Sequence, residues 1–427
     1  MFPFTGHVTC KYNDYVERRL LFYTKSPFLK PKSLILQQNQ AYYWIFMAGI
    51  YLHIPFCKTR CIYCDFFSTT QSHLKSCYIE ALCKELRMRK EYLEGEDITT
   101  IYFGGGTPSQ LDEEDFKQIF STIHEVYGLE KATEITLEAN PDDLTPEYIH
   151  MLTTLPFNRV SMGIQTFHDP TLKLLNRRHN AAQAIQAVEQ LRTEGFNNIS
   201  IDLIYGLPGE TLEQWENDLK QAISLRPEHI SAYHLTYEEG TCIYRMLTDK
   251  QITEVDEECS LTFFSTLIDR LSAAGYKQYE ISNFCLPHFH SRHNSSYWIG
   301  VPYLGCGPSA HSYNKISREW NIASLEKYIT SIEANKREYE IETLSLATRY
   351  NEFIMTGLRT MQGISLQQLE EKFGTTFAHY CNKMSRSALA NQLLENTGKQ
   401  LRLTHKGIFV SDDIISDLLW IEEEEEE

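Results

Sequence analysis

Three closely spaced cysteines are the residues whose pattern points most directly to chemistry. Cys57, Cys61 and Cys64 form a C-x3-C-x2-C pattern on the loop after a predicted strand. Soft thiolate ligands select iron–sulfur clusters or zinc. A structural zinc ion needs four ligands, and His53 is the nearest residue that can complete such a site.

The spacing of these cysteines favours a four-iron cluster over zinc. Other candidates for a fourth zinc ligand, Cys77 and Cys83, lie far along the chain. The pattern also lacks the fourth cysteine that follows in bacterial ferredoxins, where every iron is capped. Three protein ligands leave one iron open, and an open iron can bind a chelating cofactor. We therefore expect a reactive centre and not a simple electron store.

Composition sets the class of protein around this centre. The 427 residues exceed the ~150 typical of one domain. Acidic residues outnumber Lys and Arg by 57 to 40, a net charge of −17, which disfavours nucleic acid as a partner. Eleven cysteines without regular pairing argue against a disulfide framework, and no apolar run reaches the ~20 residues of a membrane span. We expect a cytoplasmic protein with at most peripheral membrane contact.

Short apolar strands alternate with helices through the first part of the chain. Such alternation predicts parallel strands with right-handed crossovers. Six strands are fewer than the eight of a closed barrel, so we expect an α/β fold with a partial, open (β/α)6 barrel that binds ligands at the carboxyl ends of its strands. The predicted strands are Gly49–His53, Thr99–Phe103, Glu134–Glu138, Arg159–Gln165, Asn198–Ile204 and His229–Leu235.

Helices are predicted between these strands and after them. Apolar periodicity and capping residues place helices at 112–127, with Asp112 as the cap, and at 181–194 and 211–225. The rhythm changes after Asp249. A helix at 256–274, a strand at 278–282 and a hairpin around 401–410 predict a smaller α+β, winged-helix-like domain.

These patterns suggest a division of the chain. We expect an N-terminal extension outside the fold at 1–46, with Met47 as the natural start, and the core barrel at 47–249. A segment at 250–315 would close the barrel, a helical C-terminal domain would occupy 316–421, and 422–427 would be an acidic tail.

The cysteine pattern within Tyr51-Leu-His-Ile-Pro-Phe-Cys57 resembles the radical S-adenosylmethionine superfamily, in its coproporphyrinogen dehydrogenase-like branch. The resemblance extends from about residue 47 to 420. It implies a 4Fe–4S cluster whose open iron binds the amino and carboxylate groups of S-adenosylmethionine. Reductive cleavage of that cofactor gives a 5′-deoxyadenosyl radical, chemistry that side chains alone do not supply.

The resemblance also assigns cofactor contacts. The Gly-Gly-Gly-Thr-Pro segment at 104–108 would contact the methionyl amino group, although a lone segment of this kind reads as a tight turn. Glu138 would accept hydrogen bonds from the ribose hydroxyls, the alternative being a solvated acid at a strand end. The implied contacts near the cluster and cofactor are Tyr51, Tyr63, Gly105, Gly106, Thr107 and Glu138.

Three further polar residues match positions that contact a second S-adenosylmethionine in the dehydrogenase. They are Gln165, Arg177 and Asp202. Polar groups within apolar strands need partners, so these residues either bind a ligand or form a buried polar network with each other.

One position separates two branches of the family. The dehydrogenase has a further cysteine two residues after the third ligand, where this chain has Phe66. The chain is instead similar to the HemW family of heme chaperones, which shares the His293-Asn-Ser-Ser-Tyr-Trp298 pattern and the segments at 303–311 and 403–407. This resemblance implies heme as cargo, a heme-acceptor protein of unknown identity and an electron donor such as a flavodoxin or ferredoxin.

The same resemblance makes His293 the candidate heme ligand. Imidazole is a common axial ligand and aromatic rings cover porphyrin faces, but a core histidine bonded to its neighbours is the alternative. Cys306 and His311 are weaker candidates. For the whole protein, the alternatives to a heme chaperone are an oxygen-independent coproporphyrinogen III dehydrogenase, an enzyme that performs two radical decarboxylations, and a zinc-stabilised binding module.

Overall fold

Six parallel strands form the centre of the large sheet. The computed structural model describes residues 47–421, and within them this sheet has twelve strands in the order β12-β11-β10-β9-β1-β2-β3-β4-β5-β6-β8-β7. Each of β1 to β6 pairs in parallel with the next, which confirms the predicted partial (β/α)6 barrel. The six are β1 (Met47–Ile54), β2 (Asp97–Gly105), β3 (Glu134–Ala139), β4 (Arg159–Gln165), β5 (Ile199–Tyr205) and β6 (His229–His234).

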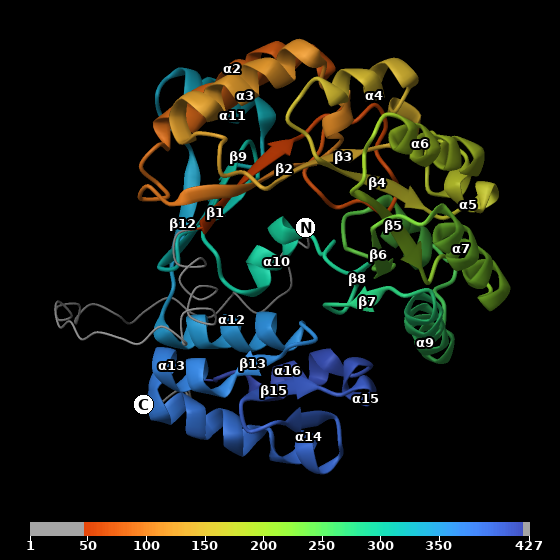
Figure 1. Cartoon of the computed structure of the whole chain (residues 1–427), viewed down its shortest axis with the longest axis vertical. Coiled ribbons are helices and arrows are strands. Elements are labelled where there is room, and N and C mark those ends of the chain that lie inside the picture. The colour runs from red at the N-terminus through yellow and green to blue at the C-terminus, as the bar shows by residue number, and fades with distance from the viewer. Residues whose placement is uncertain (1–46, 422–427) are drawn as a thin grey trace.

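Helices cover the convex side of this curved sheet (Figure 1). Asp112, Asn180 and Thr211 each close a capping box at the start of α3, α6 and α7, where the sequence predicted these helices to begin. The helices of this layer are α2 (Lys75–Met88), α3 (Glu113–Tyr127), α4 (Pro146–Thr153), α5 (Asp169–Leu174), α6 (Ala181–Thr193) and α7 (Leu212–Leu225). The short helix α8 (Cys242–Thr248) follows β6 and contacts the cysteine loop, where the N–H of Ile243 donates to the carbonyl of Ile62 at 2.9 Å.

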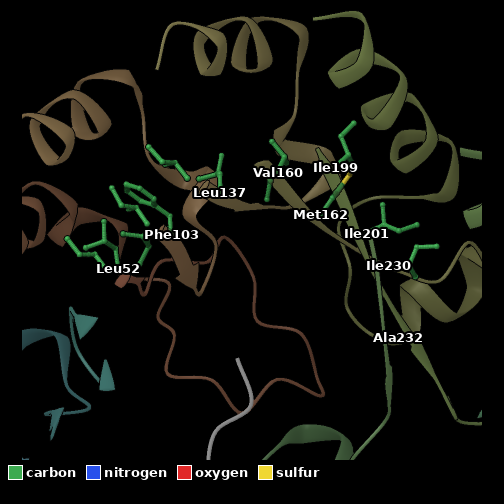
Figure 2. Close-up of a cluster of buried hydrophobic side chains, with 14 of the residues drawn as sticks. Leu52, Phe103, Leu137, Val160, Met162, Ile199, Ile201, Ile230 and Ala232 are labelled. Carbon is green, nitrogen blue, oxygen red and sulfur yellow. The ribbon is translucent and has the colours of Figure 1, made fainter. Parts of the chain in front are cut away.

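Each strand places apolar side chains on one face of the sheet and polar side chains on the other. Leu137 and Val160 point toward the surrounding helices, with the other labelled side chains of Figure 2, and belong to one buried apolar cluster. Because successive side chains point to opposite faces of a strand, Glu138, Arg159 and Ser161 face the concave side. The inside of the barrel is therefore polar.

The sheet continues on both edges of the parallel strands. On one edge β9 pairs in parallel with β1, and on the other β8 pairs antiparallel with β6. These later elements are α9 (Glu257–Ala273), β7 (Lys277–Gln278), β8 (Asn283–Cys285), α10 (Arg292–Trp298), β9 (Tyr303–Cys306), β10 (His311–Tyr313), β11 (Ser317–Asn321), α11 (Leu325–Glu333) and β12 (Tyr339–Thr343). The helix predicted at 256–274 is confirmed as α9, and α10 lies on the concave side of the sheet (Figure 1).

The predicted single strand at 278–282 is wrong. Gln278 pairs with Phe284 across a tight reversal, so the segment forms two short antiparallel strands, β7 and β8. The reversal is stabilised by the backbone N–H of Tyr279, which donates to the carbonyl of Asn283 at 3.1 Å. Local apolar residues indicated a strand but did not indicate this turn.

The C-terminal part folds around a small antiparallel sheet of its own. Its elements are α12 (Leu346–Leu358), β13 (Ile364–Ser365), α13 (Leu366–Met384), α14 (Arg386–Ala390), β14 (Leu394–Asn396), β15 (Gln400–Leu403), α15 (His405–Ile408) and α16 (Ser411–Leu418). The hairpin predicted at 401–410 lies earlier in the chain, because β14 and β15 form it at 394–403. The second half of the predicted range is instead the short helix α15, which Thr404 caps.

The proposed division of the chain needs one change. Strands β11 and β12 belong to the large sheet, so a domain that starts at residue 316 would cut through that sheet. The other internal boundaries stay predictions, and the predictions for 1–46 and 422–427 lie outside the described residues. No helix in the described part of the chain is long and apolar enough to span a membrane.

Candidate functional site

The loop that carries the three cysteines leaves the carboxyl end of β1 and is held in place by backbone hydrogen bonds. The N–H of Cys57 donates to the carbonyl of Thr69 at 2.9 Å, and the N–H of Ile62 donates to that of Leu175 at 3.3 Å. The thiols of Cys57, Cys61 and Cys64 are half-buried. As a free thiol, Cys64 has its pKa raised by burial to about 12.

The residues around this loop do not complete a zinc site. Both ring nitrogens of His53 are occupied, Nδ1 by the Tyr51 hydroxyl at 3.1 Å and Nε2 by the Phe67 carbonyl at 2.8 Å. Cys77 and Cys83 lie on α2. Within residues 47–421 no three or more His, Cys, Asp or Glu side chains, the three loop cysteines included, are gathered closely enough to hold a metal ion. Three thiols without a fourth ligand fit a cluster with an open iron better than zinc.

A set of hydrogen bonds connects two of the three thiols through residues of neighbouring loops. Arg177 donates from Nη1 to the Cys61 sulfur at 3.3 Å and from Nη2 to the Asn140 side-chain oxygen at 2.6 Å. The Asn140 amide donates to the Thr107 hydroxyl at 3.4 Å, and that hydroxyl lies 3.3 Å from the Cys57 sulfur. The predicted residues Thr107 and Arg177 are thereby brought next to the cysteine loop.

Asp143 holds the cysteine loop in place through its carboxylate. Its carboxylate is buried and accepts hydrogen bonds from Lys58 within the loop at 2.9 Å and from Arg178 at 3.1 Å. Ser109 and Gln110, just after the glycine segment, donate to its other oxygen at 2.9 and 2.6 Å. One carboxylate therefore fixes two segments of the site relative to each other.

The glycine segment lies between Glu138 and β1. The N–H of Gly105 donates to Glu138 at 3.2 Å, and Tyr102 donates to the second carboxylate oxygen at 2.7 Å. Burial raises the pKa of Glu138. Gly105 has a φ of +107°, and a Cβ there would lie 2.7 Å from the His53 ring, so a larger residue does not fit. Gly106 is equally restricted, because its Cβ would lie 2.8 Å from the backbone of Pro55.

The remaining predicted contacts occupy different depths of the barrel. Gln165 sits at the end of β4 with a φ of +70°. Asp202 lies deeper, beside the hydroxyls of Ser161 and Ser231, and burial raises the pKa of its carboxyl group. Tyr51 is buried against Tyr102, whereas Tyr63 packs on a separate apolar cluster near Arg177.

His293 lies on α10 against the inner side of the sheet. Its Nδ1 lies 2.8 Å from the Thr100 hydroxyl and its Nε2 lies 2.8 Å from the Tyr297 hydroxyl. Its ring stacks on Tyr102, and burial lowers its pKa to about 3. Direct ligation of heme iron would require one of these bonds to break, so His293 as a heme ligand stays a prediction. Of the weaker candidates, Cys306 is fully buried in the apolar core and His311 stacks on Trp320.

Sequence reasoning missed the residues that support this site. Asn140 and Asp143 follow Glu138 in the same turn, and Arg178 follows Arg177. Their positions next to predicted contacts were the available signal. Their partners on distant segments were visible only after folding.

Comparison with known proteins first defines the class. A family model described as the Radical SAM superfamily matches residues 51–222, and one described as the HemN C-terminal domain matches 344–410. The solved structure of coproporphyrinogen III oxidase (HemN) from Escherichia coli has a TM-score of 0.76 at 22% identity, covering 90% of this chain and 93% of that one, which supports the fold. The fold, the cysteine loop and the glycine segment define a radical S-adenosylmethionine protein, a class that implies a 4Fe–4S cluster and S-adenosylmethionine.

Relatives with higher identity narrow the class. The heme chaperone HemW of Lactococcus lactis is 34% identical over 370 residues, which cover 86% of this chain and 96% of that protein. A zebrafish protein named radical S-adenosyl methionine domain-containing protein 1, mitochondrial, is 28% identical over 389 residues, 87% of each chain. The chain belongs to the HemW family.

Proposed function

We propose that this protein is a heme chaperone that binds a 4Fe–4S cluster and S-adenosylmethionine and passes heme to an acceptor protein. The observation that carries the proposal is its similarity to proteins named heme chaperone HemW along nearly their whole length. Phe66 adds support, because it stands where the dehydrogenase would have an additional cysteine.

The residues of the site have distinct parts in this proposal. Cys57, Cys61 and Cys64 would hold the cluster, which together with the sulfonium cofactor supplies one-electron chemistry when bound. Glu138 and the backbone of Gly105 and Gly106 would orient the cofactor. Tyr51, Tyr63, Gln165, Arg177 and Asp202 are further proposed contacts at this end of the barrel and inside it.

Partners follow from the same chemistry. A cluster that is reduced in use needs an electron donor, which we propose to be a flavodoxin or ferredoxin. The heme acceptor is a second protein, and the chaperone would meet it in the cytoplasm.

Heme titration of the purified protein tests the proposal directly. The wild-type protein should bind one heme per chain, measured by the Soret band, and His293→Ala should weaken binding or shift the band if His293 ligates iron. His150→Ala, which removes an exposed histidine on α4 that is not a candidate heme ligand, is the control. Absence of a saturable heme complex in the wild-type protein would refute the chaperone function.

A complementation test distinguishes the alternative function, coproporphyrinogen dehydrogenase, from the heme chaperone. Expression of this protein in a strain that lacks coproporphyrinogen oxidase should not restore growth, because Phe66 replaces the additional cysteine of the dehydrogenase. Restored growth would favour the enzyme. An expressed Cys57→Ala variant distinguishes growth that depends on the cluster from growth that does not.

A further inference from the structure

A buried arginine inside the barrel forms no salt bridge with another residue of the described chain. Arg159 begins β4, its side chain faces the concave side of the sheet, and the residue is 1% exposed. Its Nε and Nη1 atoms have no hydrogen-bond partner, and no carboxylate of the described residues forms an ion pair with it. A charge buried in this way is costly unless something pairs with it.

A second unpartnered donor lies beside it on the neighbouring strand. Thr136 pairs with Arg159 in the parallel register of β3 and β4, so both side chains emerge on the same face. Thr136 is fully buried, and its hydroxyl also has no hydrogen-bond partner within residues 47–421. The next residue on each strand, Leu137 and Val160, points toward the helices in Figure 2. Because side chains alternate along a strand, Thr136 and Arg159 face the concave side.

The surrounding polar groups are already engaged elsewhere. Tyr102 donates to Glu138, and His293 uses both ring nitrogens. The Nδ1 of His229 lies 2.8 Å from the Ser200 hydroxyl, and its Nε2 lies 2.7 Å from the Tyr279 hydroxyl. The Asp202 carboxylate is near enough to Arg159 for the two charges to interact, but its hydrogen bonds go to Ser231 and Ser161. Among the described residues, Nε and Nη1 of Arg159 and the hydroxyl of Thr136 are therefore left without a hydrogen-bond partner.

We propose that Arg159 and Thr136 bind a carboxylate of a ligand held inside the barrel. A guanidinium presents parallel donors that match the two oxygens of a carboxylate, and the threonine hydroxyl adds a third donor. Two sources share this chemistry: a propionate of heme, which rests on the function proposed above, and the carboxylate of S-adenosylmethionine.

Depth in the barrel favours the propionate. Arg159 lies four residues before Gly163, whose carbonyl accepts from Arg177 beside the cysteine loop. At the rise of a β-strand, the two positions are about 13 Å apart. The carboxylate of a cofactor bound to the cluster stays near the loop, whereas a porphyrin is large enough to carry a propionate away from it.

The experiment compares heme with heme dimethyl ester, in which both propionates are blocked. We expect Arg159→Met to weaken heme binding about tenfold or more, and Thr136→Val by a smaller factor. The ester should bind the wild-type protein about as weakly as heme binds the Arg159→Met variant. The Arg159→Met substitution should not weaken the binding of the ester any further. The melting temperature should not fall in Arg159→Met, because the substitution removes an unpaired charge and not a structural ion pair.

The outcomes separate this inference from the proposed function. If the wild-type protein binds heme and Arg159→Met binds both heme and S-adenosylmethionine unchanged, the carboxylate site is refuted while the chaperone function stands. If only the binding of S-adenosylmethionine to the cluster-loaded variant weakens, measured by equilibrium dialysis, the site is supported and the cofactor is the source. Should Arg159→Met fail to fold, Arg159→Lys and the ester with wild-type protein decide the question.

Discussion

The three thiols of the cysteine loop have unequal surroundings. Cys61 accepts a hydrogen bond from Arg177, and Cys57 lies next to the Thr107 hydroxyl. Hydrogen bonds to cluster sulfurs are among the features by which proteins set the potential of an iron–sulfur centre. The loop thus supplies ligands, while the segment after α5, the turn after β3 and the glycine segment supply the groups around them.

Substitution of a single thiol tests the ligand assignment. Cys57→Ala, Cys61→Ala or Cys64→Ala should each abolish the cluster, because two thiolates hold it poorly. Iron content and the visible spectrum after anaerobic purification measure the effect. Cys77→Ala, on the exposed face of α2, is the control and should keep about four irons per chain. Iron retained by any of the three loop variants would contradict the assignment.

At the scale of elements, two buried carboxylates connect helices and loops through hydrogen bonds. Asp143 joins the cysteine loop to the residues after the glycine segment. Glu85 on α2 accepts from the Gly307 backbone at 2.9 Å, the Asn321 amide at 2.7 Å and the Tyr328 hydroxyl at 2.7 Å. Each joins segments that are distant in sequence.

The Asp143 anchor should affect both stability and cluster retention. Asp143→Asn keeps the size of the side chain but loses the charge that pairs with Lys58 and Arg178, so we expect about 1–3 kcal/mol of destabilisation. The cluster should also lose iron faster to a chelator, followed by absorbance. Glu147→Gln, an exposed charge on α4, should change neither quantity.

The Glu85 contacts should be essential to the docking of α2. Glu85→Ala removes an acceptor that is 0% exposed and leaves three donors unsatisfied, so the free energy of unfolding should fall by about 3–5 kcal/mol. Denaturant unfolding measures the change. Glu80→Ala, exposed on the same helix, should stay within about 0.5 kcal/mol of wild type. Equal effects of the two substitutions would show that the buried contacts contribute little.

At the scale of the whole molecule, the C-terminal part is attached to the end of the large sheet. The N–H of Ile281 donates to the Arg359 carbonyl, and the N–H of Met361 donates to the Tyr279 carbonyl, each at 3.1 Å. Glu280 is buried at this junction and accepts a hydrogen bond from Asn283. Burial raises the pKa of Glu280 to about 7.

That raised pKa makes the junction sensitive to pH. Between the unfolded pKa near 4.5 and the folded pKa near 7, the folded chain keeps a proton that the unfolded chain loses. Stability should therefore fall by about 1–3 kcal/mol as pH rises through this range and level off above it. Glu280→Gln should flatten that part of the curve, measured by denaturant unfolding at pH 5, 6, 7 and 8. An identical decline in the variant would assign the effect to other groups.

Local signals in the sequence predicted local structure well. Asp112 and Thr211 marked helix starts because a cap depends on a few adjacent residues. Short apolar segments that alternate with helices along the chain likewise marked the parallel strands. The prediction failed at 278–282 and 401–410, where a turn and a strand pairing decide the structure and the flanking residues carry little of that information.

The sequence by itself determined the cysteine loop, the positions of the six parallel strands along the chain and the absence of a nearby fourth thiol, because these depend on residue type and short spacing. Only the tertiary structure decided which side chains meet. The bonds of Arg177 to Cys61 and Asn140, and the pairing of Thr136 beside Arg159, join strands and loops that are distant along the chain. Such contacts depend on the register and curvature of the sheet, and no short segment encodes either property.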